Sequence, residues 1–148
     1  MTAPRLTLLV IQHGLLARAG VSGSPLRITA LHLSQRPAQG TLADLIEAAA
    51  RPGGNLSGPV WVLTDDVFVQ VLKLNADAVR DLKDSELGQA LAYEAQVVSG
   101  MGPAESALGW RGLQGTGRER EFQVVQMPRA DRERAQDAVR SLGGRLAG

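Results

Sequence analysis

The chain has 148 residues, of which 44% are hydrophobic, enough for one ordinary domain or two small lobes. A formal net charge of +1 argues against a general nucleic-acid-binding protein, because neutralising phosphates requires a basic surface. The lack of cysteine excludes disulfides, thiolate metal sites and cysteine nucleophiles. No apolar run approaches the roughly 20 residues of a membrane span, so we expect no direct membrane insertion.

The first part of the chain predicts a meander of strands, then a helix and another strand. The three meander strands are expected at residues 5–12, 15–21 and 26–33. The first is a continuous aliphatic run, which is typical of a strand buried on both faces. Thr41 and Asp44 form a variant of the capping box that begins a helix. Residues 60–64 follow the helix, so they are expected to pair parallel to the first strand.

The later part predicts a second lobe of similar size. Alternating apolar side chains in residues 67–74 indicate a strand, and residues 83–103 read as a long amphipathic helix ended by glycine and proline. Two more strands and a last helix are expected at residues 107–113, 122–127 and 129–142. Residues 145–148 are expected to be an irregular end. The predicted order is therefore βββαβ followed by βαββα, an α/β (α+β) protein.

The long helix is expected to cover the sheet of the second lobe with one apolar stripe. The stripe consists of Leu87, Ala90, Leu91, Ala95 and Val98, which recur at helical spacing. Glu94 falls within this stripe. Its carboxylate must either reach water at the edge of the stripe or be paired with a cation or a backbone donor.

A flank beside this stripe is the candidate partner-binding surface. It consists of Ala90, Tyr93 and Val97, bordered by Glu86 and Glu94. A docking partner segment would meet an aliphatic surface rimmed by carboxylates. Two alternatives remain: the first lobe covers this flank, or a partner adds a strand to an open sheet edge. Pairing of such edges between two copies would make a homodimer.

The sequence offers no recognisable catalytic, nucleotide-binding or metal motif. There is no P-loop, and the two histidines, His13 and His32, fit a turn and a strand surface. Asp65 and Asp66 stand between two strands, where paired acids are typical turn formers. We therefore expect no catalytic residue, no metal and no cofactor.

An ordered set of residues carries a resemblance to a known family. Glu86–Leu87, Ala90, Tyr93–Glu94 and Pro103 follow one another along and after the helix. The strand pair at 107–113 and 122–128 comes next. Together with the element order and Gly14, this set resembles the actin-like ATPase superfamily. Within it, the closer likeness is to the assembly proteins of type IV pili (PilM) and of type II secretion (GspL).

The resemblance implies both a fold and a role. The fold would be an actin-like, ribonuclease-H-like lobe at residues 1–65. A small inserted α/β lobe, together with the C-terminal helix, would follow at residues 66–148. The role would be a cytoplasmic scaffold at the inner-membrane face. Such a scaffold binds a protein partner, either a subunit of the assembly platform or a secretion ATPase.

One departure from the family pattern bears on activity. Nucleotide-binding members carry an aspartate before the glycine of the first turn, whereas Gln12 stands there in this chain. An amide is a poorer Mg²⁺ ligand than a carboxylate. The chain also ends before a second actin-like half that would close a nucleotide cleft. We expect no enzymatic activity. The alternatives are an actin-like nucleotide-binding protein truncated before its second half, and a generic peptide-binding α/β module.

Overall fold

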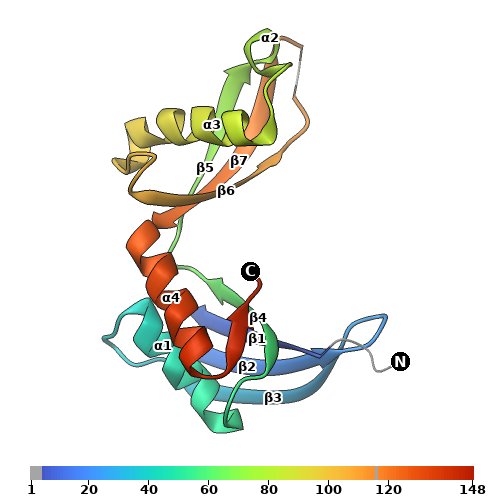
Figure 1. Cartoon of the computed structure of the whole chain (residues 1–148), viewed down its shortest axis with the longest axis vertical. Coiled ribbons are helices and arrows are strands. Elements are labelled where there is room, and N and C mark those ends of the chain that lie inside the picture. The colour runs from blue at the N-terminus through green and yellow to red at the C-terminus, as the bar shows by residue number, and fades with distance from the viewer. Residues whose placement is uncertain (1–4, 116) are drawn as a thin grey trace. The chain divides into compact units, whose positions relative to one another are not determined.

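The computed structural model describes residues 5–115 and 117–148 and divides the chain into two compact units. The first unit combines Met1–Asp66 with Glu133–Gly148, and the second is Val67–Arg132. Each unit has its own sheet and its own hydrophobic core, and Figure 1 labels their elements.

The first unit is built on a five-stranded mixed sheet in the order β3-β2-β1-β4-β8. Its strands are β1 (Leu6–Gln12), β2 (Leu15–Ser22), β3 (Arg27–Gln35), β4 (Gly58–Thr64) and β8 (Gly144–Leu146). β1, β2 and β3 pair antiparallel, while β4 pairs parallel to both β1 and β8. The predicted meander and the predicted parallel pairing with the first strand are both confirmed. The register of β2 against β3 shifts between Gly20 and Val21, which marks a β-bulge or irregularity.

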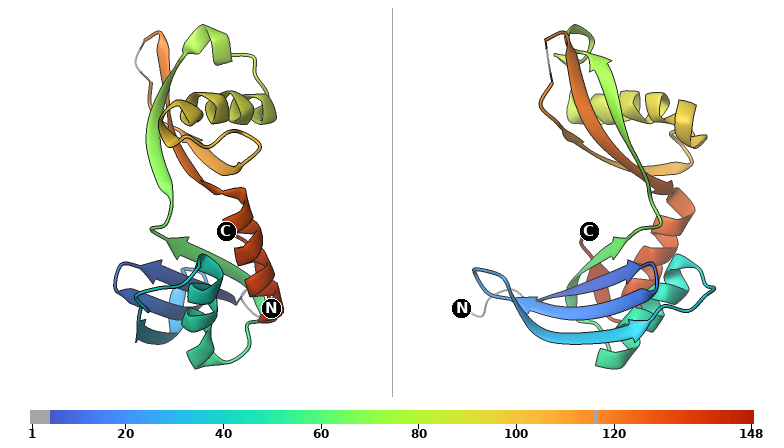
Figure 2. Two further views of the ribbon diagram at one scale, coloured as in Figure 1. Left: turned by 90° about the vertical axis from the view of Figure 1, so that its left-hand side faces the viewer. Right: turned by 180° about the vertical axis from the view of Figure 1, so that it is seen from behind.

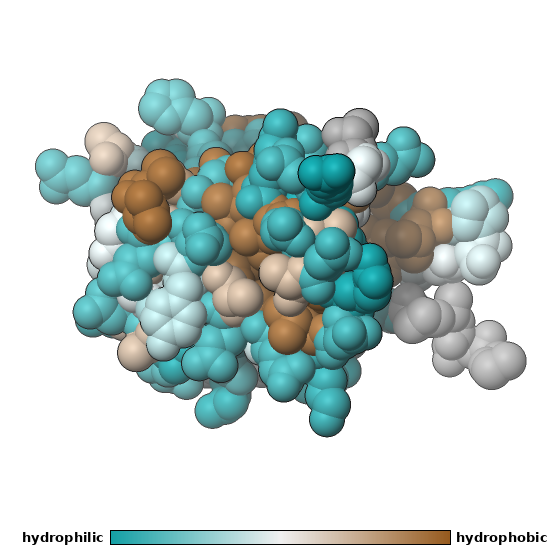
Figure 3. Space-filling model, turned by 90° about the horizontal axis from the view of Figure 1, so that it is seen from above, coloured by the Kyte–Doolittle hydropathy of each residue, from teal (hydrophilic) through white to brown (hydrophobic). Residues whose placement is uncertain are grey.

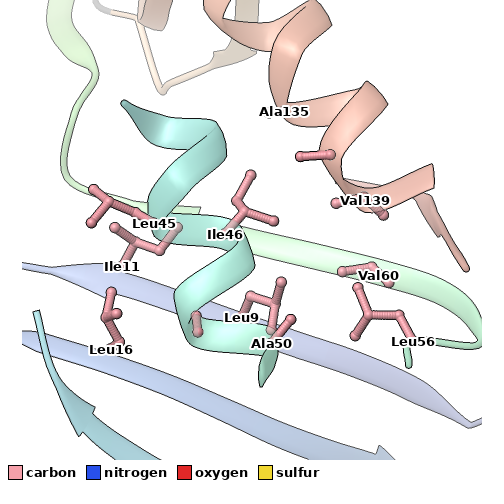
Figure 4. Close-up of a cluster of buried hydrophobic side chains, with 12 residues drawn as sticks. Leu9, Ile11, Leu16, Leu45, Ile46, Ala50, Leu56, Val60, Ala135 and Val139 are labelled. Carbon is pink, nitrogen blue, oxygen red and sulfur yellow. The ribbon is translucent and has the colours of Figure 1, made fainter. Parts of the chain in front are cut away.

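Two helices cover one face of this sheet. They are α1 (Leu42–Ala50), followed by the 3-10 turn η1 (Arg51–Gly53), and the part of α4 (Arg129–Ser141) that belongs to the first unit. Figure 4 shows their apolar side chains meeting those of β1, β2 and β4 in one core. That core consists of Leu9, Ile11, Leu16, Leu45, Ile46, Ala49, Ala50, Leu56, Val60, Ala135, Ala138 and Val139.

Polar side chains hold both ends of α1. At its start the Thr41 hydroxyl accepts from the Asp44 amide at 3.3 Å, and the Asp44 carboxylate accepts from the Thr41 amide at 3.0 Å. The predicted capping box is therefore confirmed. After its end, Arg18 on β2 donates to the carbonyls of Ala50, Gly54 (2.6 Å) and Asn55 (3.3 Å). The first of these bonds pairs the Ala50 carbonyl, which the end of the helix leaves without an intrahelical partner, and the other two hold the loop that follows.

The C-terminal helix is where the predicted domain division was wrong. The sequence placed it with the second lobe at 66–148, but residues from 133 onward belong to the first unit. The reason is that Ala135, Ala138 and Val139 pack into the core of the five-stranded sheet. The expected irregular end also contains β8, which extends this sheet beside β4. Three residues paired along a sheet edge leave too short a pattern to be seen in sequence.

The second unit is a three-stranded antiparallel sheet covered on one face by a helix, as Figures 1 and 2 show. Its elements are β5 (Phe68–Asn75), the short α2 (Ala76–Val79), α3 (Asp84–Ser99), β6 (Ser106–Gly112) and β7 (Glu119–Pro128). The strand order is β5-β7-β6. The core under α3 consists of Val79, Leu87, Leu91, Ala95, Phe122 and Val124.

The packing of α3 also explains a glycine inside the helix. Trp110 on β6 meets Phe122 edge-on at 5.9 Å between ring centroids and lies under α3. A Cβ at Gly88 would stand 3.2 Å from the Trp110 indole nitrogen. Glycine costs helix stability of up to about 1 kcal/mol relative to alanine. At this position it lets the helix approach the indole closely.

The capping box of α1 generates a pH-dependent prediction. Hydrogen bonds from the Thr41 backbone and side chain hold the pKa of Asp44 below its ordinary value. Stability from this carboxylate is therefore present above its unfolded-state pKa and is lost as the pH falls through the lowered folded-state pKa. We expect Asp44→Ala to lower the urea midpoint at pH 7, and this deficit to shrink on acidification below pH ~4.

Glu47→Ala serves as the matched control, because Glu47 is exposed on the same helix and outside the capping box. Its effect on the midpoint should not follow the same pH dependence. A deficit for Asp44→Ala that is constant between neutral and acidic pH would contradict the assignment.

The α3 stripe gives a second prediction, because the structure corrects one of its members. Leu91 is fully buried, whereas Val98, predicted to be buried in the stripe, is 66% exposed. We expect Leu91→Ala to cost about 2–5 kcal/mol of unfolding free energy through lost burial and a cavity. Val98→Ala should cost under about 0.5 kcal/mol. Denaturant titration followed by Trp110 fluorescence in a Trp61→Phe background measures both; equal losses would contradict this packing.

Candidate interaction surface

The helix α3 is held rigidly at both ends. At its start the Glu86 carboxylate accepts from the Lys83 amide at 2.8 Å. At its end Gly100 adopts a left-handed conformation with φ of 73°, and its amide donates to the Gln96 carbonyl at 2.9 Å. Glycine reaches this conformation without the steric cost of a side chain. The helix therefore begins and ends at defined residues.

A polar network under the helix fixes its second half to the sheet. Gln70 on β5 donates to the Ala95 carbonyl at 3.2 Å and to the Gln126 side-chain oxygen at 3.4 Å. Gln126 on β7 is 1% exposed and donates to the Ser106 hydroxyl at 3.4 Å. A buried amide is tolerated only when its hydrogen bonds are made. The network therefore positions α3 as well as satisfying Gln126, and nothing in the sequence pattern marked it.

The predicted partner-binding residues lie together on the side of α3 that faces away from the sheet. Ala90 is half-buried, while Tyr93 is 59% and Val97 83% exposed. Glu86 and Glu94 are exposed beside them. The spacing of Glu86, Ala90, Tyr93 and Val97 by four, three and four residues places these four on one helical face. Glu94 lies at the border between this face and the face that packs on the sheet. We call this set the α3 outer face.

The two glutamates of the α3 outer face differ in what they already do. Glu86 caps the helix through the Lys83 amide, so it is partly committed to the fold. Glu94 is exposed and makes no hydrogen bond or ion pair with any residue that the structure describes. Glu94 was expected either to reach water or to be paired with a cation or a backbone donor, and the structure supports the first alternative.

Val98 extends the exposed apolar surface beyond the predicted set. It follows Val97 directly and is itself largely exposed. Sequence reasoning assigned it to the buried stripe because its spacing from Leu91 and Ala95 is helical, but Ala95 is the last residue of α3 in the core. Figure 3, which views the molecule from above, shows apolar residues exposed among hydrophilic ones. Exposed aromatic and aliphatic side chains beside charges are typical of protein-binding surfaces.

The other candidate groups are tied into turns. The Asp65 and Asp66 carboxylates accept from the Arg36 guanidinium at 3.2 and 3.0 Å, and the Asp66 amide donates to the Thr64 hydroxyl. Gln12 ends β1 and is exposed. Within residues 5–115 and 117–148, no three His, Asp or Glu side chains come together as a metal site. No helix in those ranges is long and apolar enough to cross a membrane.

Comparisons with known proteins add the fold relationship. No protein-family model matches the sequence, and no curated protein is similar to it. Among solved structures, the chain is similar to the PilM–PilN type IV pilus biogenesis complex, with a TM-score of 0.68 and 20% identity. It is also similar to the cytoplasmic domain of EpsL, an inner-membrane component of the type II secretion system of Vibrio cholerae. There the TM-score is 0.63 and the identity is 11%.

The extent of these matches is as informative as their scores. They cover 95% and 97% of this chain but only 45% and 55% of the solved chains, so this chain spans about half their length. Identities this low show the fold alone. The chain therefore shares its α/β fold with parts of these two solved structures. The resemblance to PilM and GspL-type proteins, first suggested by short motifs, is thereby confirmed at the level of the fold.

Proposed function

We propose that this protein is a non-catalytic cytoplasmic scaffold at the inner-membrane face, in the assembly platform of a type IV pilus or type II secretion system. The observation that carries the proposal is the fold, which is similar over nearly the whole chain to two proteins of such systems. One of the two solved structures is a complex with a protein partner, PilN. Partner binding is the activity that a scaffold of this kind needs.

We assign the partner contact to the α3 outer face. Tyr93 and Val97 offer a rigid apolar surface, because the helix beneath them is capped and packed. Glu94 adds a carboxylate that no described residue neutralises. Complementary chemistry in the partner is an apolar segment flanked by lysine or arginine. A subunit of the assembly platform and the secretion ATPase are the two partner classes to be tested.

The assignment predicts the effect of a double substitution on binding. We expect Tyr93→Ala with Glu94→Ala to weaken binding of the partner segment about 10- to 100-fold, since aromatic anchors dominate such interfaces. Isothermal titration calorimetry with cytoplasmic segments of platform proteins and ATPases from the same genome measures the effect. Circular dichroism must first show an unchanged fold.

The matched control is Gln136→Ala, because Gln136 is also exposed but lies on α4 and takes no part in the α3 outer face. It should leave affinity unchanged. Unaltered affinity for the double variant would remove the α3 outer face from the proposal. Failure of every such segment to bind the wild type would count against the assembly role itself.

The proposal includes the absence of ATPase activity. Its support is the amide of Gln12 at the position where nucleotide-binding relatives of the superfamily carry an acid. We expect calorimetry with ATP to give no Mg²⁺-dependent heat of binding. Gln12→Asp provides the informative comparison, since it restores the carboxylate. A Mg²⁺-dependent signal with the wild-type chain would overturn this part of the proposal.

A further inference from the structure

The face of the five-stranded sheet that α1 and α4 do not cover is almost entirely apolar. The alternation of side chains along each strand and the pairing register between strands place two complete rows of side chains across this face. One row consists of Leu63, Val10, Ala17 and Leu33, on β4, β1, β2 and β3. The next row consists of Trp61, Leu8, Ala19 and Leu31 on the same strands. We call this surface the open sheet face.

The open sheet face exposes an apolar area in the upper half of the range that a typical monomer leaves in its largest patch. Six large side chains on it are between 37% and 65% exposed: Leu15, Ile28, Leu31, Leu33, Trp61 and Leu63. Together they expose roughly 500 Å² of apolar area, where the largest patch of a typical monomer is about 300–600 Å². Each partner in a standard protein interface contributes about 800 Å², so this patch supplies more than half of the area that one partner needs.

Charge separates this face from the α3 outer face. On β1 to β4 the open sheet face carries no charged side chain within the described residues, and Arg145 on β8 stands at its rim. A two-fold contact pairs a surface with itself, so a surface whose charges all have one sign repels its copy, whereas an uncharged surface does not. The α3 outer face, with Glu86 and Glu94, would repel itself. The uncharged face therefore suits a second copy of this chain.

The shape of the open sheet face is also self-complementary, because rows of small and large side chains alternate across it. Ala17 and Ala19 make a low row along β2, while Leu8 and Val10 on the neighbouring β1 stand higher. A two-fold axis parallel to the strands, between β1 and β2, lays the β1 row of one copy over the alanine row of the other. The same axis lays β3 over β4, so all four strands are covered. Packed sheets stand about 10 Å apart with their side chains interdigitated.

We propose that two copies of this chain associate through the open sheet face, with β3 of each copy over β4 of the other. In this arrangement Leu33 of one copy lies opposite Leu63 of its partner, because both belong to one row. Leu31 likewise lies opposite Trp61. The inference rests on the first unit alone and is independent of the proposed function.

The test is the mass of the full chain in solution, by sedimentation equilibrium or light scattering, at about 100 µM, well above the Kd expected of a standard interface. We expect twice the 15.7 kDa chain mass for the wild type. Leu33→Glu and Leu63→Lys should each weaken the dimer about 100-fold or more, since each buries an unpaired charge twice. Mixing the two variants should restore a dimer, because the opposite charges meet across the interface.

Val97→Glu is the matched control: Val97 is the more exposed apolar residue, but it lies on α3. It should leave the mass at that of the dimer. A monomeric wild type would overturn the proposal, whatever else covers the face. Dimers of Leu33→Glu as tight as those of the wild type would overturn it too. A mixture of the two charged variants that stays monomeric would refute the arrangement of β3 over β4.

Discussion

The packing of α3 on its sheet is the constraint on which the account of function depends. Leu87, Leu91 and Ala95 are buried against Phe122 and Val124, and this choice of face leaves the opposite face to solvent. The Gln70 amide bonded to the Ala95 carbonyl prevents the helix from rotating without breaking a polar network. A helix fixed in this way presents Tyr93 and Val97 without the entropy cost of ordering a loop on binding.

The long-range order of the first unit follows from equally simple patterns. The strand meander was visible as aliphatic runs between glycine turns, and the capping box of Thr41 and Asp44 marked the helix start. The parallel pairing of β1 with β4 followed from the helical connection between them. The strands and the helix start were predictable because they depend on residues close together in the chain. The pairing of β1 with β4 was predictable because the type of connection limits it.

The features that were missed depend on tertiary contacts. The alanine spacing of α4 does not say which core it joins, and the structure places Ala135 and Ala138 in the core of the five-stranded sheet. The helical period assigned Val98 to the buried stripe, although Ala95 is the last residue of α3 in the core. The Gln126 network was invisible because a single glutamine in a strand resembles a surface residue. The exposure of Tyr93 and Val97 follows from helical spacing alone, and their role in partner binding stays a prediction.

The two uncovered surfaces have different chemistries and therefore suit different partners. The α3 outer face combines apolar side chains with carboxylates, which favours a basic amphipathic segment. The open sheet face is uncharged and suits a copy of itself. The sequence predicts that the first strand is buried on both faces. In the structure, its side chains Leu8 and Val10 lie on the face of the sheet that no helix covers. The sequence thus carried a signal for an additional covering layer.

The measurement that tests the central claim most directly is backbone amide chemical-shift mapping of the labelled chain during titration with a bound platform segment. The account predicts that the largest changes fall on α3 between Ala90 and Val98, with the amides of β5 and β6 little affected. Changes confined to the β5 or β6 edge, with α3 unmoved, would contradict it and would indicate strand addition instead.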